Sequence, residues 1–417
     1  KGASFTASRL YENKEFLAST DSWFRPVNMY VDPDGALYIL DYYRQIIEHP
    51  EWMEDEVVKS GALYNGMDKG RIYRITPEGT PSASWTKGFK LGDASSEQLV
   101  ERLADPNSWY RRNAQRLLID RQDKTVISQL ERMAENPGSP LGRLHALWTL
   151  EGMNTLSAST IKKALKDPVA GIRENAVRLS ELYLAGEQDM LSALLAMKDD
   201  PDAKVRFQLL CTLGFSDDSR SANVVQHLLF KDIDDEWAQI AALSALSSRG
   251  TGLLQAVLNR YHPGNTAYAS LIERLSAMAA AGGNTEMVKS LIQNALRPVA
   301  KNKAGWQTPV LKGIARGLRN GKIGASSLQK EQEALLQAAL GNESFVSRGS
   351  LEILKVIGLP SGAGAKTALE NAQRIAENPG MPEQKRTEAV DFLVFGKAET
   401  YIDLFKTLIS PKEPLPV

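Results

Sequence analysis

The sequence contains one cysteine, no long apolar run and no excess of charge of either sign. Cys211 cannot form an internal disulfide by itself, and a C-x-x-C-H haem attachment site needs two cysteines. No apolar stretch approaches the roughly 18 residues that a membrane-spanning helix requires. Lysine and arginine together number 50, and so do aspartate and glutamate, whereas binding to a phosphate backbone calls for a basic surplus. These absences argue against a disulfide scaffold, a transmembrane segment and nucleic-acid binding.

Recognisable catalytic motifs are also missing. The sequence has no nucleophile elbow, phosphate-binding loop, zinc-protease helix or dinucleotide fingerprint in a suitable context, and its histidines lack metal-ligand spacing. We therefore expect no catalytic residue, no metal site and no bound cofactor in this chain. The chain also opens at Lys1 without an initiator methionine or a charged-then-apolar leader. We expect it to be a piece of a longer protein.

Aromatic residues are concentrated at the beginning of the chain, with 14 of the 30 in the first 90 residues. Turn signals precede short β-like runs in the same region: Asp32-Pro33-Asp34-Gly35 stands before residues 36–40, and Met67-Asp68-Lys69-Gly70 stands before residues 71–75. Polar and apolar residues alternate over 71–75, as in a half-buried strand. The sequence therefore predicts a small β segment over residues 1–78. Residues 79–92, which contain Gly79, Pro81 and Gly88, are predicted to be a linker.

Beyond residue 92, pairs of helices recur with a period of just over thirty residues. The markers stand 31, 31 and 33 residues apart, at Asp105-Pro106, Asn136-Pro137, Asp167-Pro168 and Asp200-Pro201. An arginine follows each marker by six or seven residues, and a small residue such as Ala114, Ala146 or Ala176 follows nearby. We expect the Asp or Asn to cap the second helix of each pair, and the alanine to lie where two helices cross closely.

This period predicts a mainly α fold, an α-solenoid of about eight or nine helical pairs over residues 93–410, preceded by the small β segment and followed by a proline-rich tail, 411–417. The pattern D-P-x-x-x-x-R-x-x-A resembles HEAT repeats. In such a stack no helical pair buries its apolar face without its neighbours.

The β segment resembles the last part of the β-propeller in large bacterial proteins called membrane-bound dehydrogenases. Five motifs in this order carry the resemblance: Phe24-Arg25-Pro26-Val27, Asp32-Pro33-Asp34-Gly35-Ala36-Leu37-Tyr38, Asp41-Tyr42-Tyr43, Ile46-Ile47-Glu48-His49-Pro50 and Gly70-Arg71-Ile72-Tyr73-Arg74-Ile75. Those proteins are similar to sugar (sorbosone or glucose) dehydrogenases that depend on pyrroloquinoline quinone, and HEAT repeats follow their propeller. Because a propeller blade has four strands, 90 residues supply only one or two blades.

The resemblance implies a parent protein that oxidises a sugar or alcohol outside the cytoplasm and passes electrons to a c-type haem domain. The quinone and the haem would belong to the parent, because the blades that carry the quinone and the catalytic base are missing here. The solenoid would then hold the two domains apart. The alternative is a scaffold without catalysis that binds a partner protein or a polysaccharide.

One group of side chains is a candidate binding site at the propeller mouth. Asp41, Tyr43, Glu48 and His49 fall within nine residues at the end of a predicted strand. His49 could accept a proton there, with its pKa raised by Glu48. Alternatively, the tyrosine packs between blades and His49 begins a turn. We favour this second interpretation, because neighbouring residues in an extended chain point to opposite faces.

The recurring charged residues are the other candidate set. The arginines are Arg111, Arg143, Arg173 and Arg206, and the aspartates with the same period are Asp105, Asp167 and Asp200. The arginines could line a ridge that binds phosphates or acidic peptides. We favour a structural ladder instead, in which each arginine pairs with the aspartate of its own or a neighbouring repeat.

Overall fold

The computed structural model describes residues 2–80, 90–245, 250–299, 304–341 and 344–409. The predicted tail and residues 81–89 of the predicted linker lie outside these ranges. The chain forms two compact units, Lys1–Ser216 and Asp217–Val417. Their boundary falls within the predicted solenoid and not at the predicted linker.

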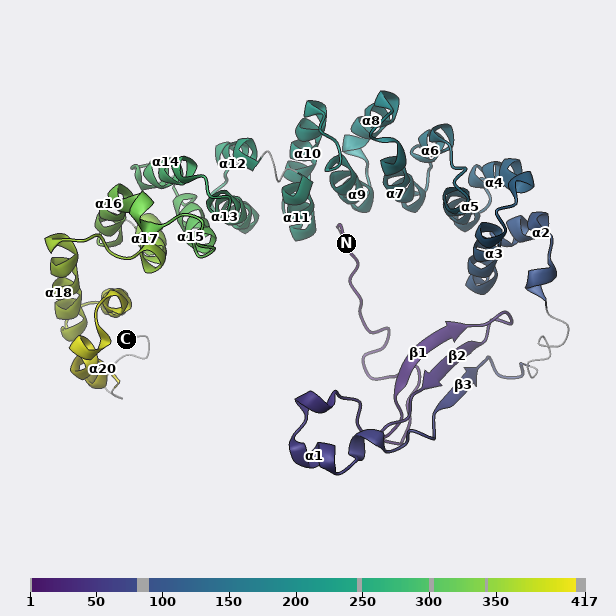
Figure 1. The fold of residues 1–417 in the computed structure, drawn as a ribbon, viewed down its shortest axis with the longest axis horizontal. Coiled ribbons are helices and arrows are strands. Elements are labelled where there is room, and N and C mark those ends of the chain that lie inside the picture. The colour runs from purple at the N-terminus through teal and green to yellow at the C-terminus, as the bar shows by residue number, and fades with distance from the viewer. Residues whose placement is uncertain (1, 81–89, 246–249, 300–303, 342–343, 410–417) are drawn as a thin grey trace. The chain divides into compact units, whose positions relative to one another are not determined.

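A three-stranded antiparallel sheet lies in the first unit, with strand order β1-β2-β3 (Figure 1). Its strands are β1 (Pro26–Val31), β2 (Leu37–Asp41) and β3 (Arg71–Ile75), and a short helix, α1 (Asp55–Lys59), lies between β2 and β3 in the chain. The predicted turn joins β1 to β2: the Gly35 N–H donates to the Asp32 carbonyl oxygen at 2.9 Å, and Gly35 has a φ of +81°. Such a left-handed conformation favours glycine at this position.

The sequence does not predict β1, although it predicts β2 and β3. All six residues of β1 are exposed, so buried and exposed positions do not alternate along it. Its pairing with β2 is also irregular between Pro26 and Asn28, because proline cannot donate a ladder hydrogen bond. The strand exists because β2 offers a free edge for hydrogen bonding, which is a tertiary and not a local condition.

The remainder of the first unit is helical. Its helices are α2 (Ser96–Arg102), α3 (Ser108–Arg121), α4 (Ile127–Ala134), α5 (Pro140–Gly152), α6 (Ala158–Ala164), α7 (Ala170–Leu179), α8 (Gln188–Leu195) and α9 (Ala203–Leu213). Helices α3, α5, α7 and α9 pack side by side in one layer, and α2, α4, α6 and α8 form a second layer. The predicted small positions Ala114, Ala146 and Ala176 are completely buried in the first of these layers.

The second unit, taken by itself, is also built from two layers of helices. Its helices are α10 (Ser219–Lys231), α11 (Glu236–Ala245), α12 (Gly250–Asn259), α13 (Thr266–Ala281), α14 (Thr285–Leu296), α15 (Gln307–Leu318), α16 (Gln329–Ala339), α17 (Ser344–Ile357), α18 (Ala363–Glu377), α19 (Glu383–Phe392) and α20 (Ile402–Leu408). Helix α15 packs between α13 and α17, while α14 packs against α16 (Figure 1). In the described residues, α2 to α19 form nine consecutive pairs, which confirms the predicted α-solenoid preceded by a small β segment.

The marker residues have a different role from the predicted one. Asp105 does not cap a helix; its Oδ1 accepts the N–H of Asn107 at 2.9 Å within the loop. Asn107 caps α3 instead, through a hydrogen bond from the Trp109 N–H at 2.8 Å. Asp200 and the cap Asp202 of α9 repeat this arrangement. The marker therefore folds the loop between two helices, and a residue two or three positions later begins the helix.

Asn107 also joins the solenoid to the sheet. Its side-chain Nδ2 donates to the carbonyl oxygens of Asp32 at 2.8 Å and Pro33 at 3.2 Å, in the turn between β1 and β2. One side chain therefore caps the second helix of the first pair and holds the neighbouring sheet turn.

Two glycines bring α15 unusually close to α13. A Cβ atom added at Gly313 would lie 2.3 Å from the Glu273 carbonyl oxygen, and one added at Gly317 would lie 2.3 Å from that of Ala277. These positions are four residues apart and so share one face of the helix. The contact between the two helices therefore depends on the absence of side chains at both positions.

We expect Gly317→Ala to lower the free energy of unfolding by about 1–3 kcal/mol or more, because the added methyl group meets backbone atoms. Gly171→Ala in α7 is the matched control. A Cβ atom there meets nothing within 4 Å. The change should therefore raise the free energy of unfolding by about 0.4–1 kcal/mol, because it restricts the unfolded chain. Urea denaturation of both variants measures the difference. Equal effects of the two substitutions would contradict the close approach of α13 and α15.

Candidate functional site

Two of the four residues predicted at a propeller mouth lie together, and their contacts are structural. Asp41 is almost completely buried, and its Oδ1 accepts the N–H groups of Arg25 at 2.8 Å and Tyr43 at 2.9 Å. Its Oδ2 lies 3.7 Å from the Arg71 guanidinium, which stacks over the Tyr43 ring at 4.0 Å. Tyr43 itself has a φ of +48°, a left-handed conformation that few residues with side chains adopt. Asp41 thus holds a strained corner of the chain.

The other two predicted residues do not join this corner. Glu48 and His49 are exposed beyond it. The His49 Nδ1 lies 3.8 Å from a carboxylate oxygen of Glu51, and its ring centroid lies 5.9 Å from that of Trp52. The described residues therefore show no direct ion pair between Glu48 and His49.

Cationic side chains around the sheet already have partners. Arg25 donates to the carbonyl oxygens of Ser22, Phe24 and Gln45. Arg44 donates to three carbonyl oxygens, and Arg74 pairs with Asp34 at 2.5 Å. Pyrroloquinoline quinone carries three carboxylates, which need cationic or N–H donors. Arg25 and Arg44 do not fit that group, because their donors hold the fold itself.

Two of the recurring arginines, Arg143 and Arg173, each join two loops of the solenoid. Arg143 donates from Nη1 to the carbonyl oxygens of Asn136 at 2.7 Å and Pro137 at 3.3 Å, in its own marker loop. Its Nε and Nη2 donate to the two carboxylate oxygens of Asp167, in the next loop, at 2.7 Å and 3.0 Å. A planar guanidinium suits such paired contacts, which a lysine could not make. The Arg143 side chain is 4% exposed, so it presents no surface for phosphate.

The same geometry recurs one repeat later. Arg173 donates to the carbonyl oxygens of Asp167 and Pro168, and its Nε and Nη2 donate to the Asp200 carboxylate at 2.7 Å and 2.9 Å. Arg206 donates from Nη1 to the carbonyl oxygen of Asp200 at 2.7 Å. We call these arginines and the carboxylates of the following loops the arginine ladder. It connects consecutive repeats and uses the charges that a ligand would need.

The first step of the arginine ladder lacks its carboxylate. Arg111 donates to the carbonyl oxygens of Asp105 and Pro106, but its buried Nε has no hydrogen-bond partner among the described residues. The next marker is Asn136, whose Oδ1 accepts the Gly138 N–H at 2.9 Å. The pKa of the neighbouring His145 is lowered to about 4, first by burial and then by the charges of Arg111 and Arg112.

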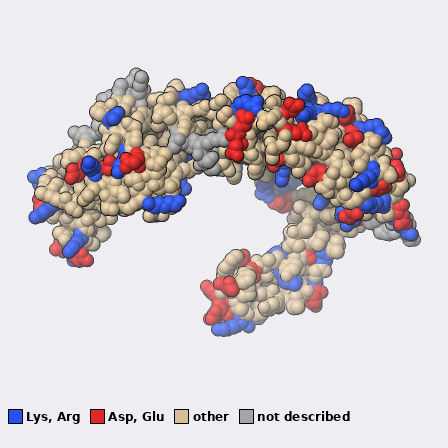
Figure 2. Space-filling model, turned by 45° about the horizontal axis from the view of Figure 1, so that its top comes forward, with Lys and Arg blue, Asp and Glu red and all other residues tan. Residues whose placement is uncertain are grey.

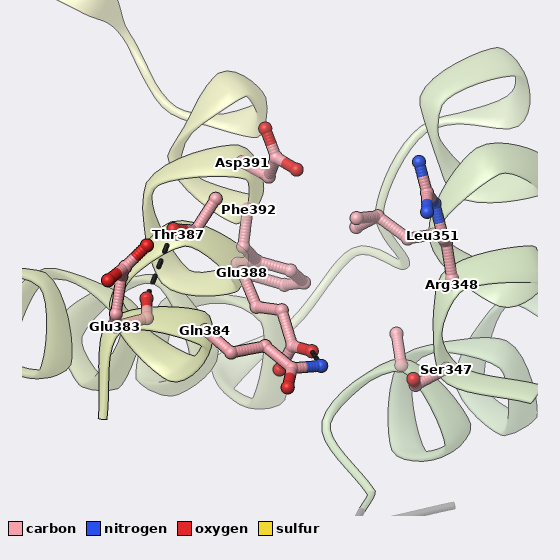
Figure 3. Close-up of a pocket in the computed structure, with 10 residues that line it drawn as sticks. Ser347, Arg348, Leu351, Glu383, Gln384, Thr387, Glu388, Asp391 and Phe392 are labelled. Atoms are coloured by element: carbon pink, nitrogen blue, oxygen red, sulfur yellow. Dashed lines mark hydrogen bonds between the residues drawn. The ribbon is translucent and has the colours of Figure 1, made fainter. Parts of the chain in front are cut away.

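A cavity of about 720 Å³ opens between α17 and α19 in the second unit. Figure 3 shows Ser347, Arg348 and Leu351 of α17 facing the polar side of α19. The residues of α19 that line it are Glu383, Gln384, Thr387, Glu388, Asp391 and Phe392. We call it the acidic cavity. It offers carboxylates, one guanidinium and the apolar side chains of Leu351 and Phe392.

The sequence does not predict this cavity, although the spacing of polar residues along α19 indicates one of its walls. Glu383, Thr387 and Asp391 recur every four residues, and Gln384 and Glu388 follow the same spacing one position later. This pattern places a polar stripe along one side of a helix. The sequence could not show that α17 stands away from this stripe.

The described residues contain neither a metal-binding cluster nor a membrane-spanning helix. No group of three or more His, Cys, Asp or Glu side chains is placed to hold a metal ion. No helix in the described ranges has both the length and the apolar character of a membrane span. On the face drawn in Figure 2, Lys and Arg are interspersed with Asp and Glu.

Parts of the chain are similar to a known family and to solved structures. Residues 1–79 match a family model described as a domain of unknown function, DUF7133. No curated protein matches the sequence. Two solved structures are similar, both with low TM-scores. One, from a study of a phosphorylation switch in the interaction between cadherin and beta-catenin, shares 13% identity over 75% of this chain and 87% of its own, with a TM-score of 0.31. An engineered protein shares 14% identity over 76% of this chain and 95% of its own, with a TM-score of 0.27.

Restoring the missing carboxylate of the arginine ladder tests its energetic role. We expect Asn136→Asp to raise the free energy of unfolding by about 1 kcal/mol, because the Arg111 Nε gains a charged partner. The pKa of His145 should rise from about 4 in the same variant, as measured by NMR titration. Combining the change with Arg111→Met provides the control: a stability gain that persists without the guanidinium would rule out the new pair as its cause.

The arginine ladder also predicts a dependence of stability on pH. Burial by itself raises the pKa of Asp200, but hydrogen bonds from Arg173 and the Asp202 N–H outweigh it and hold the pKa below 3.8. A carboxyl group with a pKa lowered by folding stabilises the fold above its unfolded pKa, and this contribution disappears as the pH falls through the folded value.

We therefore expect Asp200→Asn to lower the free energy of unfolding by about 2 kcal/mol at pH 7. This difference in stability from the natural chain should shrink below pH 3.8. Urea denaturation from pH 7 down to the lowest pH at which the fold persists measures this difference. A constant difference over that range would show that Asp200 does not contribute through its charge.

Proposed function

We propose that this chain is the scaffold portion of a dehydrogenase-like protein outside the cytoplasm, whose parent oxidises a sugar or alcohol with pyrroloquinoline quinone. In this proposal the sheet packs as a blade of a β-propeller. The HEAT-type solenoid holds the propeller at a fixed distance from an electron-accepting domain with c-type haem. The substrate class, the two cofactors and the location follow from the resemblance of the five motifs in the β segment.

The observation that carries the proposal is that both faces of the sheet expose apolar side chains. By the strand register, Met29, Val31 and Tyr73 lie on one face, whereas Tyr30, Leu40 and Ile72 lie on the other. Met29 is 64% exposed and Ile72 is 68% exposed. Apolar surface on two sides of one sheet is typical of a layer between other layers. A blade of a propeller, which packs against a neighbour on each face, meets this requirement.

The scaffold role is supported by the way the repeats are joined. Each guanidinium of the arginine ladder holds its own loop, and those of Arg143 and Arg173 also hold the next loop, through short paired hydrogen bonds. Repeats that are fixed in this manner keep a defined spacing from one another within the first unit. Asn107 adds a contact between the first helical pair and the sheet.

Neither cofactor is proposed to bind within this chain. The arginines near the sheet are engaged by backbone carbonyls and carboxylates, as described above. Attachment of c-type haem needs two cysteines, and the sequence has only Cys211. Burial raises the pKa of the Cys211 thiol, with a smaller contribution from the Glu181 charge. This thiol is therefore poorly suited to reaction with a haem vinyl group, because the thiolate is the nucleophile.

The alternative function is a scaffold that binds a partner protein or a polysaccharide without catalysis. The acidic cavity between α17 and α19 favours it, because this cavity has the volume and polarity of a binding site. The two functions differ in what accompanies the chain. The first requires a quinone-binding propeller and a haem, whereas the second requires neither.

Purification of the protein from the cells that make it tests the proposal. We expect intact mass spectrometry to show a longer chain and visible spectroscopy to show the bands of a c-type haem. We also expect Met29 to resist peroxide oxidation in that protein but to oxidise readily in the 417-residue chain, because neighbouring blades cover it. Met278, 39% exposed on α13, is the control and should oxidise equally in both.

Each negative result has a distinct meaning. A longer protein without haem or quinone would favour the alternative scaffold. Equal oxidation of Met29 in both proteins would contradict the placement of the sheet as a covered blade. Reduction of an artificial electron acceptor by the 417-residue chain with glucose and added quinone would overturn the prediction that this portion is not catalytic.

A further inference from the structure

A second cavity adjoins the acidic cavity and has the opposite charge. It has a volume of about 390 Å³ and lies between α15 and α17, with Glu273 of α13 at its edge. Its basic lining residues are Lys312, Arg316, Arg319 and Arg348. We call it the basic cavity. Arg348 lines both cavities, so the two hollows meet at one side chain.

Several of these charges are not neutralised within the described part of the chain. Arg319 pairs with Glu352 at 3.4 Å, but Lys312, Arg316 and Arg348 form no ion pair with any described residue. The acidic cavity also contains charges that no described residue neutralises. Glu388 lies 3.4 Å from Lys385, whereas Glu383 and Asp391 have no cationic partner in the described ranges. This contrasts with Arg143 and Arg173 of the arginine ladder, which are paired with carboxylates.

We propose that the two cavities together bind an extended peptide segment of a partner protein. Its acidic side chain would lie in the basic cavity, near Lys312 and Arg316. An apolar side chain would contact Leu351 and Phe392, and a basic side chain would lie near Glu383 and Asp391. Opposite charges in adjoining hollows match a segment that carries both signs in a fixed order. This inference is independent of the proposed dehydrogenase parent.

The groove also offers partners for a peptide backbone. The amide of Gln384 and the hydroxyl of Ser347 line the acidic cavity and can bond to a peptide backbone.

The charge pattern disfavours a polyanion or a single small ion. A nucleic acid bound at Lys312 and Arg316 would bring further phosphates toward the carboxylates of α19, which would repel them. The described residues contain no group of carboxylates placed to hold a metal ion. A segment that ends its acidic portion at Arg348 avoids this repulsion.

Selection from a library of random linear peptides displayed on phage tests the proposal. The full chain is the target, and the double variant Arg348→Glu/Asp391→Lys is the counter-target. We expect enriched peptides to carry an acidic and a basic residue with an apolar residue between them. Each single variant should weaken the binding of a synthetic enriched peptide about ten-fold, and added salt should weaken it further.

Arg374→Glu is the matched control, because Arg374 is an exposed arginine on α18 that lines neither cavity. It should leave peptide affinity unchanged, and circular dichroism should show the same helix content in all variants. Failure to enrich any peptide over the double variant would overturn the proposal. Enriched peptides with charge of only one sign, or equal binding to the natural chain and both single variants, would overturn it as well.

Discussion

A helical pair of this chain cannot bury its apolar face until the next pair packs against it, and everything else in the solenoid follows from that constraint. The first unit meets it with the arginine ladder. One edge of each guanidinium satisfies the carbonyl oxygens of its own loop, and at Arg143 and Arg173 the other edge reaches the carboxylate of the next loop. Buried ion pairs add little net stability compared with apolar packing, but a single unpaired charge costs several kcal/mol. The ladder therefore fixes the spacing of the repeats more than it strengthens them.

In the second unit, close packing of helix backbones holds neighbouring pairs together. Gly313 and Gly317 allow α15 to approach the backbone of α13, so close contact replaces a charged tie. This device works only between helices that fit one another over several turns. It does not extend to α17 and α19, which stand apart around the acidic cavity. Charges that would be paired in a ladder face this opening instead. The difference between the two units explains why binding is proposed in the second and support in the first.

Local sequence patterns predict most of the elements and little of the site. The repeat period, the strands β2 and β3 and the buried alanines all follow from spacing along the chain, because helix and strand periodicity are local properties. The strand β1 could not be predicted in this way, since its residues are exposed and it forms by pairing with β2. Asp41 and His49 are near in sequence, yet Tyr43 turns the backbone between them and separates their side chains. Nearness along the chain was therefore a poor guide to a shared site.

The sequence by itself determined that two helices recur about every thirty residues and that an arginine and an acidic or amide residue recur with them, because capping, turn formation and helical periodicity act over a few residues. Only the tertiary structure decided that Arg143 pairs with Asp167 of the following loop while Arg111 meets no carboxylate. It also decided that Arg348 lines two cavities of opposite charge. Such pairings depend on the distance and angle between neighbouring repeats, and packing sets both.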